Sequence, residues 1–532
     1  MTIRTLRLGF LAAGILLPVV WLAAQTSVSP REQLIRYLDG IAKTQLDARA
    51  ASVAQIKTRA DADRRKTAVR EKILNLIGGL PDHKGGVAVK EFGSVSAEGF
   101  RVEKIAYESL PGFWVTADLY VPTGAGPFPA IVLAPGHGAG GKTENWSWGG
   151  NFARNGMMVL AYDPIGQGER LQYYDADQKK SFIGNPTGEH GEANVGPMLI
   201  GDDIARYMVN DAMRGVDYLA ARKDVDSARI GAFGCSGGGT STAYFAALDD
   251  RVKVAATACY ITSFGELLPS PTGAQDAEQS IPHFIAQGLD FADWVEAFAP
   301  KPYAVVSTQD DMFPFEGARQ TVDEVKRFYG LYSASDNIQW ITGPGVHGNL
   351  GPISPAIMAF FVKNLKGGSG DSTFAPIRAA QASDMIVTPS GQVSTAMGGE
   401  TVYSINRKRA ESLTAHAKVL SSKAEVSRLQ TQIRKDIRSL TGATIEPGSA
   451  HTEVTVQSTA QRDGYRIDTI AMTSDAGTVV AGLAAIPDGS KPKPAILMLD
   501  TASTDTATAK HSDFVRLAEA GNIVVYLQPR PT

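Results

Sequence analysis

The stretch "GAFGCSGGGTS" (residues 231–241) decides how the rest of this sequence is interpreted. It places Ser236 among glycines directly after a short apolar run. The pentapeptide from Gly234 to Gly238 fits the pattern Gly-x-Ser-x-Gly, in which a nucleophilic serine lies on a sharp turn between a strand and a helix. Because the chain contains 54 glycines, so short a pattern also arises by chance. The sequence on either side therefore has to support the interpretation.

The surrounding sequence alternates between strand and helix patterns. From residue 130 onward, short β-rich apolar runs such as "PAIVLAPGHG" and "GMMVLAYDPIGQG" each lead into a polar or glycine-rich loop. A helix with one apolar face ends near Arg222, directly before the strand that leads to Ser236. This alternation predicts an α/β fold with a mostly parallel sheet and helices on both faces. Ligands bind such sheets at the carboxyl ends of the strands. Antiparallel strands around Pro111 and a lead-in helix over 31–78 are expected before it.

The polar residues that follow these strands occur in the order that acyl transfer by serine requires. A nucleophilic serine needs a base, an acid that orients the base, and amide donors for the oxyanion. After Ser236, the strand "KPYAVVSTQDD" ends in Asp310 and Asp311, and His347 follows the next strand in a glycine-flanked loop. We predict that His347 is the base. Asp310 is the preferred acid because it directly follows the strand, and Asp311 is the alternative.

The oxyanion hole is expected to form from backbone amides next to the nucleophile. One donor is the N–H of Gly237, which follows Ser236, and the other comes from His137 or Gly138 in the loop "APGHGAGGK". Glycines in that loop let the backbone approach a ligand closely. The side chain of His137 is expected either to line the pocket or to have a structural role.

Three further side chains are hypothesised to bind substrate. Trp146 and Trp148 follow the glycine-rich loop and are suited to stack on a sugar ring, with packing in the core as the alternative. His190 belongs to an insertion that would wall the pocket, with an ordinary loop histidine as the alternative. The two cysteines, Cys235 and Cys259, are too few for a disulfide framework, and we expect buried free thiols.

These motifs together resemble a known family. Over residues 100–365 the chain is similar to the α/β-hydrolase fold, and within it to the acetyl xylan esterase and cephalosporin-deacetylase-like group. The resemblance rests on the loop around His137, "DPIGQGER" (163–170), the turn at Ser236, the acid loop and the "HG" at His347. It implies a serine esterase that cleaves acetyl or other small acyl esters of carbohydrate-type substrates, with no metal or organic cofactor. Gly237 stands where that group commonly has glutamine, which leaves the substrate open.

Two other functions are compatible with the same residues. A serine peptidase of the prolyl-oligopeptidase kind uses the same serine turn and triad, but it usually carries a propeller domain, for which the sequence before residue 100 has no room. A carbohydrate-binding protein with a degenerate hydrolase core is the non-catalytic alternative. It is suggested by a second, incomplete copy of part of the chain.

This second copy is visible as an internal repeat. "GFRVEKIAYESLPGFWVTADLYVP", from Gly99, reappears as "GYRIDTIAMTSDAGTVVAGLAAIP", from Gly464. The copy ends before any counterpart of Ser236 or His347. We therefore predict a catalytic domain over 31–365, a glycine- and serine-rich linker over 366–400, and a non-catalytic partial repeat over 401–532.

The composition limits the location and the partners. The net charge is −3 and the charges are interspersed, which argues against binding to nucleic acid. The N-terminus "MTIRTLRLGFLAAGILLPVVWLAAQT" has two arginines before an uncharged stretch, which predicts a signal peptide over 1–24. The predicted signal peptide implies a secreted or periplasmic protein that has no stable membrane span after processing. The expected partner is a small-molecule or carbohydrate ester, and the oligomeric state stays open, a homo-oligomer included.

Overall fold

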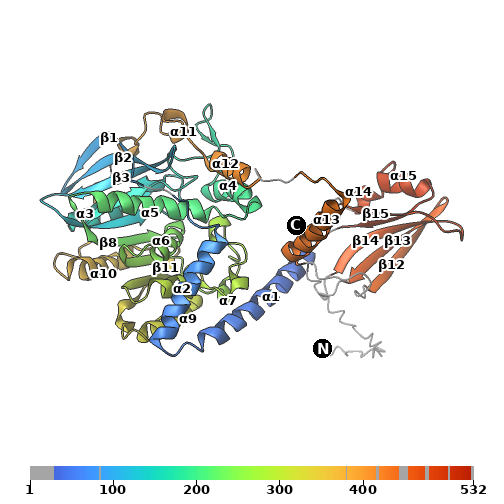
Figure 1. Ribbon diagram of the computed structural model, residues 1–532, viewed down its shortest axis with the longest axis horizontal. Helices are drawn as coiled ribbons and strands as arrows, with labels where there is room; N and C mark the ends of the chain where they lie inside the picture. Colours follow the sequence, from blue (N-terminus) through green and yellow to red (C-terminus); the bar gives the residue numbers. More distant parts are fainter. Residues whose placement is uncertain are drawn as a thin grey trace, which may run out of the picture. The chain divides into compact units, whose positions relative to one another are not determined.

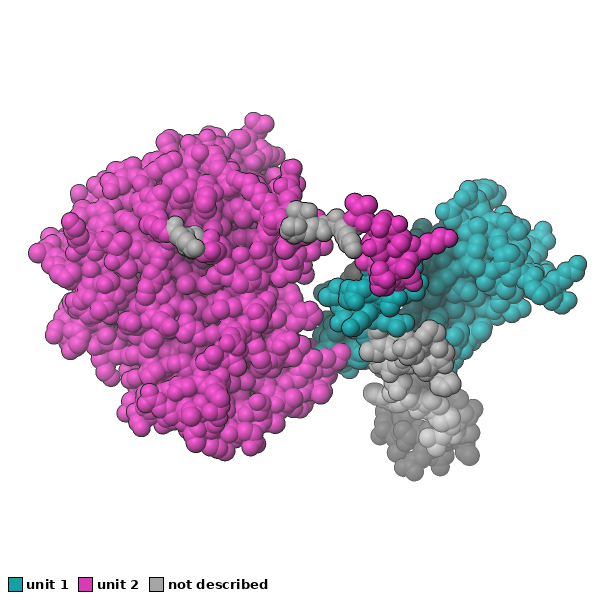
Figure 2. Space-filling model, viewed as in Figure 1, with its two compact units in different colours: residues 1–38, 430–532 teal, residues 39–429 magenta. Residues whose placement is uncertain are grey.

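The chain forms two compact units in a computed structural model (Figure 2). The larger unit comprises residues 39–429, and the smaller unit combines residues 1–38 with residues 430–532. The residues that the structure describes are 29–82, 85–378, 380–414, 419–442, 453–473, 479–500 and 504–528. The predicted signal peptide lies outside them. Within these ranges, no helix combines the length and the apolar character needed to cross a bilayer.

A sheet of nine strands forms the centre of the larger unit, in the order β1-β2-β3-β5-β4-β8-β9-β10-β11. The first three strands are antiparallel, β3 pairs antiparallel with β5, and the strands from β5 to β11 are parallel to one another. The strands are β1 (Val89–Ala97), β2 (Phe100–Leu110), β3 (Phe113–Pro122), β4 (Phe128–Ala134), β5 (Met158–Tyr162), β8 (Val225–Cys235), β9 (Val252–Ala258), β10 (Tyr303–Asp310) and β11 (Ile338–Val346).

Helices cover both faces of this sheet (Figure 1). Side chains alternate between the faces, so that in β4 Val132 packs in one core while Ile131 and Leu133 pack in the other. The helices of the first core are α2 (Arg59–Leu76), α5 (Ala205–Ala221), α6 (Gly237–Leu248), α8 (Phe291–Phe298) and α9 (Phe315–Gly330), and those of the second are α3 (Trp146–Arg154) and α10 (Ser354–Lys366). The predicted α/β class with a mostly parallel, doubly covered sheet is confirmed.

The segment predicted as a linker packs on the larger unit instead. The buried carboxylate of Glu169 accepts hydrogen bonds from the N–H groups of Val387 and Thr388 at 2.7 Å each, and it pairs with buried Lys142 at 2.6 Å. The side chain of Met385 is buried in the second core. Helix α12 (Val402–Thr414) also belongs to this unit, which ends at Leu429 rather than at residue 365. The glycine- and serine-rich composition suggested a linker. The sequence does not show that the N–H groups of Val387 and Thr388 bind the buried carboxylate of Glu169.

The smaller unit repeats the strand order of the larger one. Its sheet has the order β12-β13-β14-β16-β15, which matches β1-β2-β3-β5-β4, and the parallel pair β15–β16 matches β4–β5. The strands are β12 (Glu453–Arg462), β13 (Tyr465–Thr473), β14 (Val479–Pro487), β15 (Ala495–Leu499) and β16 (Ile523–Leu527). The helix of matching position before them is α13 (Lys423–Thr441). The repeat in the sequence is thus a repeat of topology.

Candidate active site

Ser236 lies on a sharp turn between β8 and α6. β8 ends at Cys235, α6 begins at Gly237, and Ser236 itself has φ 59° and ψ −124°. A positive φ is uncommon for a residue with a side chain, and strained conformations of this kind cluster at active sites. The flanking glycines are required by packing, because a Cβ at Gly234 would lie 2.3 Å from the carbonyl oxygen of Gly238. The backbone of this motif therefore presents the serine at the carboxyl edge of the sheet.

The glycine-rich loop after β4 lies beside this turn. A Cβ built on Gly136 would be 3.4 Å from the Cβ of Ser236. A Cβ built on Gly237 would be 2.4 Å from Nε2 of His137, so the His137 ring fills the space that a side chain at position 237 needs. This contact explains why glycine stands where related sequences were expected to have glutamine. The N–H of Gly237 opens α6, where the first amides have no partner within the helix.

Gln167 holds the glycine-rich loop in place, a function that the sequence analysis missed. Its side-chain amide donates hydrogen bonds to the carbonyl oxygens of Gly136 at 2.6 Å and Gly138 at 2.8 Å. In a trans peptide the carbonyl and the following N–H point in opposite directions, so the N–H of His137 is turned away from Gln167. The motif "DPIGQGER" was the available signal, but nothing in it showed which residues the glutamine contacts.

Replacing Gln167 tests this positioning. Gln167→Met keeps the side-chain volume and removes both donors, so the loop loses the bonds that orient its amides. We expect kcat for ester hydrolysis to fall by about 10- to 100-fold with a smaller change in KM. Steady-state kinetics of Gln167→Met and of the exposed control Gln178→Met would measure this. Equal kinetics in the two variants would contradict the assignment.

His347 pairs with Asp311 and not with the preferred Asp310. Nδ1 of His347 lies 2.7 Å from Oδ1 of Asp311, whose side chain is 2% exposed. The same carboxylate accepts hydrogen bonds from the N–H of Phe313 at 2.9 Å and the hydroxyl of Thr308 at 3.0 Å. Asp310 is the exposed last residue of β10. The prediction that Asp310 pairs with His347 was wrong, because His347 contacts Asp311. Neighbouring side chains along a strand point in opposite directions, so only one of the two carboxylates faces the histidine.

The electrostatics of Asp311 follow from these contacts. Burial raises the pKa of Asp311, but the hydrogen bond and the charge of His347, together with the Phe313 N–H, outweigh burial and hold it below its usual value. An ionised carboxylate with three donors keeps the imidazole in one orientation and leaves its Nε2 free for proton transfer.

The backbone of Ser236 and the ring of His347 each lie next to the segment of Ala258 and Cys259. The N–H of Ser236 donates to the carbonyl oxygen of Ala258, the last residue of β9, at 2.9 Å, and Cys259 follows directly after the strand. The sulfur of Cys259 and one nitrogen of His347 lie within 4.8 Å of each other. Among the described residues, no hydrogen bond joins the Ser236 hydroxyl to His347; such catalytic bonds commonly tighten only when substrate is bound. Cys235 and Cys259 both carry free thiols.

Trp146, Trp148 and His190, the three side chains proposed to bind substrate, pack against other residues of the chain. Trp146 packs against Phe100 and Tyr120, and Trp148 packs against Phe233, which agrees with the core-packing alternative. His190 is fully buried within helix α4 and not in a loop, and its Nε2 lies 2.8 Å from a backbone carbonyl oxygen. The helix spans Pro186–Leu199. The packing of the tryptophans and the buried position of His190 favour a structural role, and contact of these residues with substrate stays a prediction.

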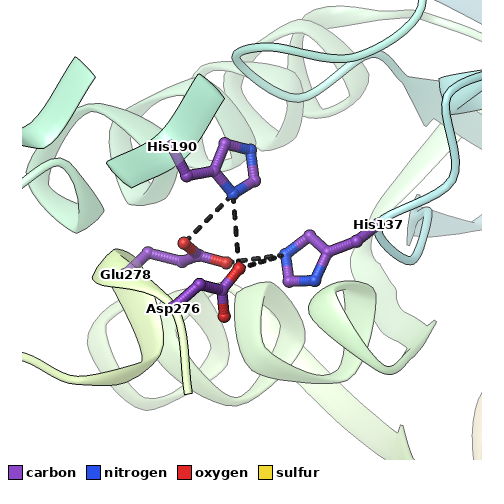
Figure 3. A group of neighbouring side chains, drawn as sticks. All are labelled: His137, His190, Asp276 and Glu278. Carbon is purple, nitrogen blue, oxygen red and sulfur yellow. Dashed lines mark hydrogen bonds and ion pairs between the residues drawn. The ribbon is translucent and has the colours of Figure 1, made fainter. Parts of the chain in front are cut away.

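His190 belongs instead to a buried cluster with His137, Asp276 and Glu278 (Figure 3). Nε2 of His137 lies 2.7 Å from Oε1 of Glu278, and Nδ1 of His190 lies 3.1 Å from Oε2 of the same residue. Burial lowers the pKa of His190, but the two carboxylates outweigh burial and raise it to about 10. Two groups of described residues have ligand atoms close enough to hold a metal ion: this cluster, and Cys259 with Asp311 and His347.

Parts of this chain are similar in sequence or in fold to known proteins. Residues 87–275 match the model of the acetyl xylan esterase (AXE1) family. A Bacillus subtilis (strain 168) protein described as "Putative hydrolase YtaP" is 24% identical over 284 residues, which cover 50% of this chain and 89% of the relative. The structure of the methylesterase BT1017 aligns with a TM-score of 0.53 and 22% identity, over 74% of this chain and 81% of its own.

The strand order, the serine turn at the carboxyl edge of the sheet and the family match over 87–275 lead to one assignment. The chain is an esterase with the α/β-hydrolase fold, similar to the acetyl xylan esterases.

Proposed function

We propose that the chain is an exported serine esterase that hydrolyses small acyl esters of carbohydrates through Ser236, His347 and Asp311. The observation that carries this proposal is the 2.7 Å contact between His347 and Asp311, at the sheet edge where Ser236 adopts its positive φ. Export rests on the N-terminal sequence, and the carbohydrate substrate rests on the family match.

Each residue has one part in the reaction. The hydroxyl oxygen of Ser236 attacks the ester carbonyl while Nε2 of His347 takes its proton, and Asp311 stabilises the resulting imidazolium. The carbonyl oxygen becomes negatively charged and accepts hydrogen bonds from the N–H groups of Gly237 and His137. His347 then protonates the leaving alcohol. In the second half of the reaction His347 activates a water molecule that releases the acid from Ser236.

A substrate panel tests the ester class. The full chain is assayed against acetylated xylose oligomers, methyl esters of sugar carboxylates, p-nitrophenyl acetate and proline-containing peptides. We expect the highest kcat/KM for an acetylated sugar. A preference for the methyl esters would keep the serine mechanism and replace the acyl class. Cleavage of peptides alone would overturn the esterase proposal in favour of a prolyl-oligopeptidase-like peptidase, and turnover of none of these substrates would favour a carbohydrate-binding protein.

A further inference from the structure

Two buried side chains, those of His190 and Glu278, and two partly exposed ones, those of His137 and Asp276, converge next to the glycine-rich loop (Figure 3). His137 follows β4, His190 lies in α4, and Asp276 and Glu278 lie at the start of a short helical turn. One ligand atom of each residue falls within 4.8 Å of those of the others. The side chains of His190 and Glu278 are 0% and 2% exposed. The mechanism proposed above uses the backbone of His137 but none of these four side chains.

Three polar atoms in this cluster make no hydrogen bond within the described part of the chain. They are Nδ1 of His190, Oδ2 of Asp276 and Oε2 of Glu278. All three are directed toward one another, with Nδ1 of His190 at 3.1 Å from Glu278 and 3.8 Å from Asp276. Buried polar atoms are nearly always paired, and here the three atoms face one point as an ion pair between His190 and the two carboxylates. A cation at that point would satisfy all of them together.

The tautomer of His190 fits metal binding. Its other ring nitrogen, Nε2, lies 2.8 Å from the carbonyl oxygen of Ile165 and donates its proton to it. A metal ion that displaces the proton from Nδ1 would bind the lone pair of this nitrogen. A ring nitrogen bonded to a backbone carbonyl is the usual setting of a histidine whose other nitrogen binds a metal, and here that other nitrogen faces two carboxylates. Glu278 is held in a similar way, since its backbone carbonyl accepts a hydrogen bond from the Tyr244 hydroxyl at 2.9 Å.

We propose that His137, His190, Asp276 and Glu278 bind a divalent transition-metal ion of the zinc class. In a tetrahedral zinc site, neighbouring ligand atoms are about 3.3 Å apart. The separations between ring nitrogens and carboxylate oxygens here are 2.7, 3.1, 3.5 and 3.8 Å. Two imidazoles with two carboxylates suit zinc, whereas calcium and magnesium take oxygen ligands only.

The bound ion would stabilise the loop beside Ser236. Nε2 of His137 faces the cluster, and the same ring lies against Gly237. Fixing this ring fixes the segment that carries the His137 N–H. The ion is a positioning group in this proposal. Zinc binding is measured without an ester substrate, so a failure of this proposal would leave the proposed ester mechanism standing.

Zinc binding by the full chain tests the site. Protein stripped with a chelator is titrated with ZnCl₂ by calorimetry, and its melting temperature is measured with and without zinc. We expect about one zinc ion per chain and a rise in Tm of roughly 3 °C or more. In His190→Gln with Glu278→Gln the affinity should fall by about 100-fold or more. The exposed histidine of the control His283→Gln should leave the affinity unchanged.

Two further measurements keep the test decisive. If the buried double variant does not fold by circular dichroism, Asp276→Asn, at a side chain that is 12% exposed, replaces it and should weaken binding by about 10-fold or more. Cobalt(II) in place of zinc should give visible d–d bands without a thiolate charge-transfer band. A thiolate band that disappears in Cys259→Ala would place the metal beside His347 and overturn the proposal. Absence of zinc binding by the wild-type chain would overturn it as well.

Discussion

Ser236→Ala is expected to lower kcat for ester hydrolysis by about 10⁴-fold or more, because the proposed acyl-enzyme forms on the Ser236 hydroxyl. The effect should appear in kcat and not in KM, since the serine hydroxyl contributes mainly to the reaction and little to substrate binding. Hydrolysis of p-nitrophenyl acetate under saturating conditions measures it. The residual rate of Ser236→Ala measures the catalysis that remains from the oxyanion donors and substrate binding.

Labelling with a fluorophosphonate provides the independent measurement. The wild-type chain and the control Ser227→Ala, at an exposed serine on the same strand β8, should label fully, and Ser236→Ala should not label. Labelling of Ser236→Ala, or a loss of activity of less than about 10-fold, would show that the nucleophile is another residue. Circular dichroism of both variants checks that the fold is retained.

Asp311→Asn is the second large effect, with kcat expected to fall by roughly 10³- to 10⁴-fold. Asparagine cannot stabilise the imidazolium, and its amide favours the wrong tautomer of His347 when it donates to Nδ1. The neighbouring Asp310→Asn is the matched control, because it removes a carboxylate one residue away whose side chain is exposed. It should change kcat by less than about 5-fold.

The comparison of these two variants decides between the two carboxylates. Steady-state kinetics at pH values from 5 to 9 would measure both. A greater loss in Asp310→Asn than in Asp311→Asn would return the acid role to the residue preferred from sequence and would require the loop after β10 to rearrange when substrate binds. Equal losses of kcat in the two variants would mean that catalysis depends on the total charge of the loop and not on the contact between Asp311 and His347.

Much of the fold could be predicted because its signals are local. The apolar runs of β4 and β8 and the amphipathic face of α5 lie within short windows, and their alternation is enough to imply a parallel sheet covered on both faces. The turn at Ser236 is equally local, since three glycines within five residues restrict the backbone there. The repeat could be predicted for the same reason, because similar sequences form similar strand orders.

The contacts between distant segments could not be predicted in this way. Gln167 reaches carbonyl oxygens about thirty residues earlier in the chain, and Glu169 binds backbone N–H groups more than two hundred residues later. Both bonds follow from the need to satisfy buried polar groups, and only the folded chain shows which partner is near. The interpretation of 366–400 as a linker was wrong on this account.

The sequence by itself determined the class of fold, the position of the serine turn and the restriction of the acid to two adjacent carboxylates. Only the tertiary structure decided that His347 meets Asp311, that His137 fills the space beside Gly237, and that His190 turns inward toward Glu278. The physical reason is that backbone conformation depends on neighbours along the chain. The partner of a buried polar side chain depends instead on which donor or acceptor the fold brings within hydrogen-bonding distance.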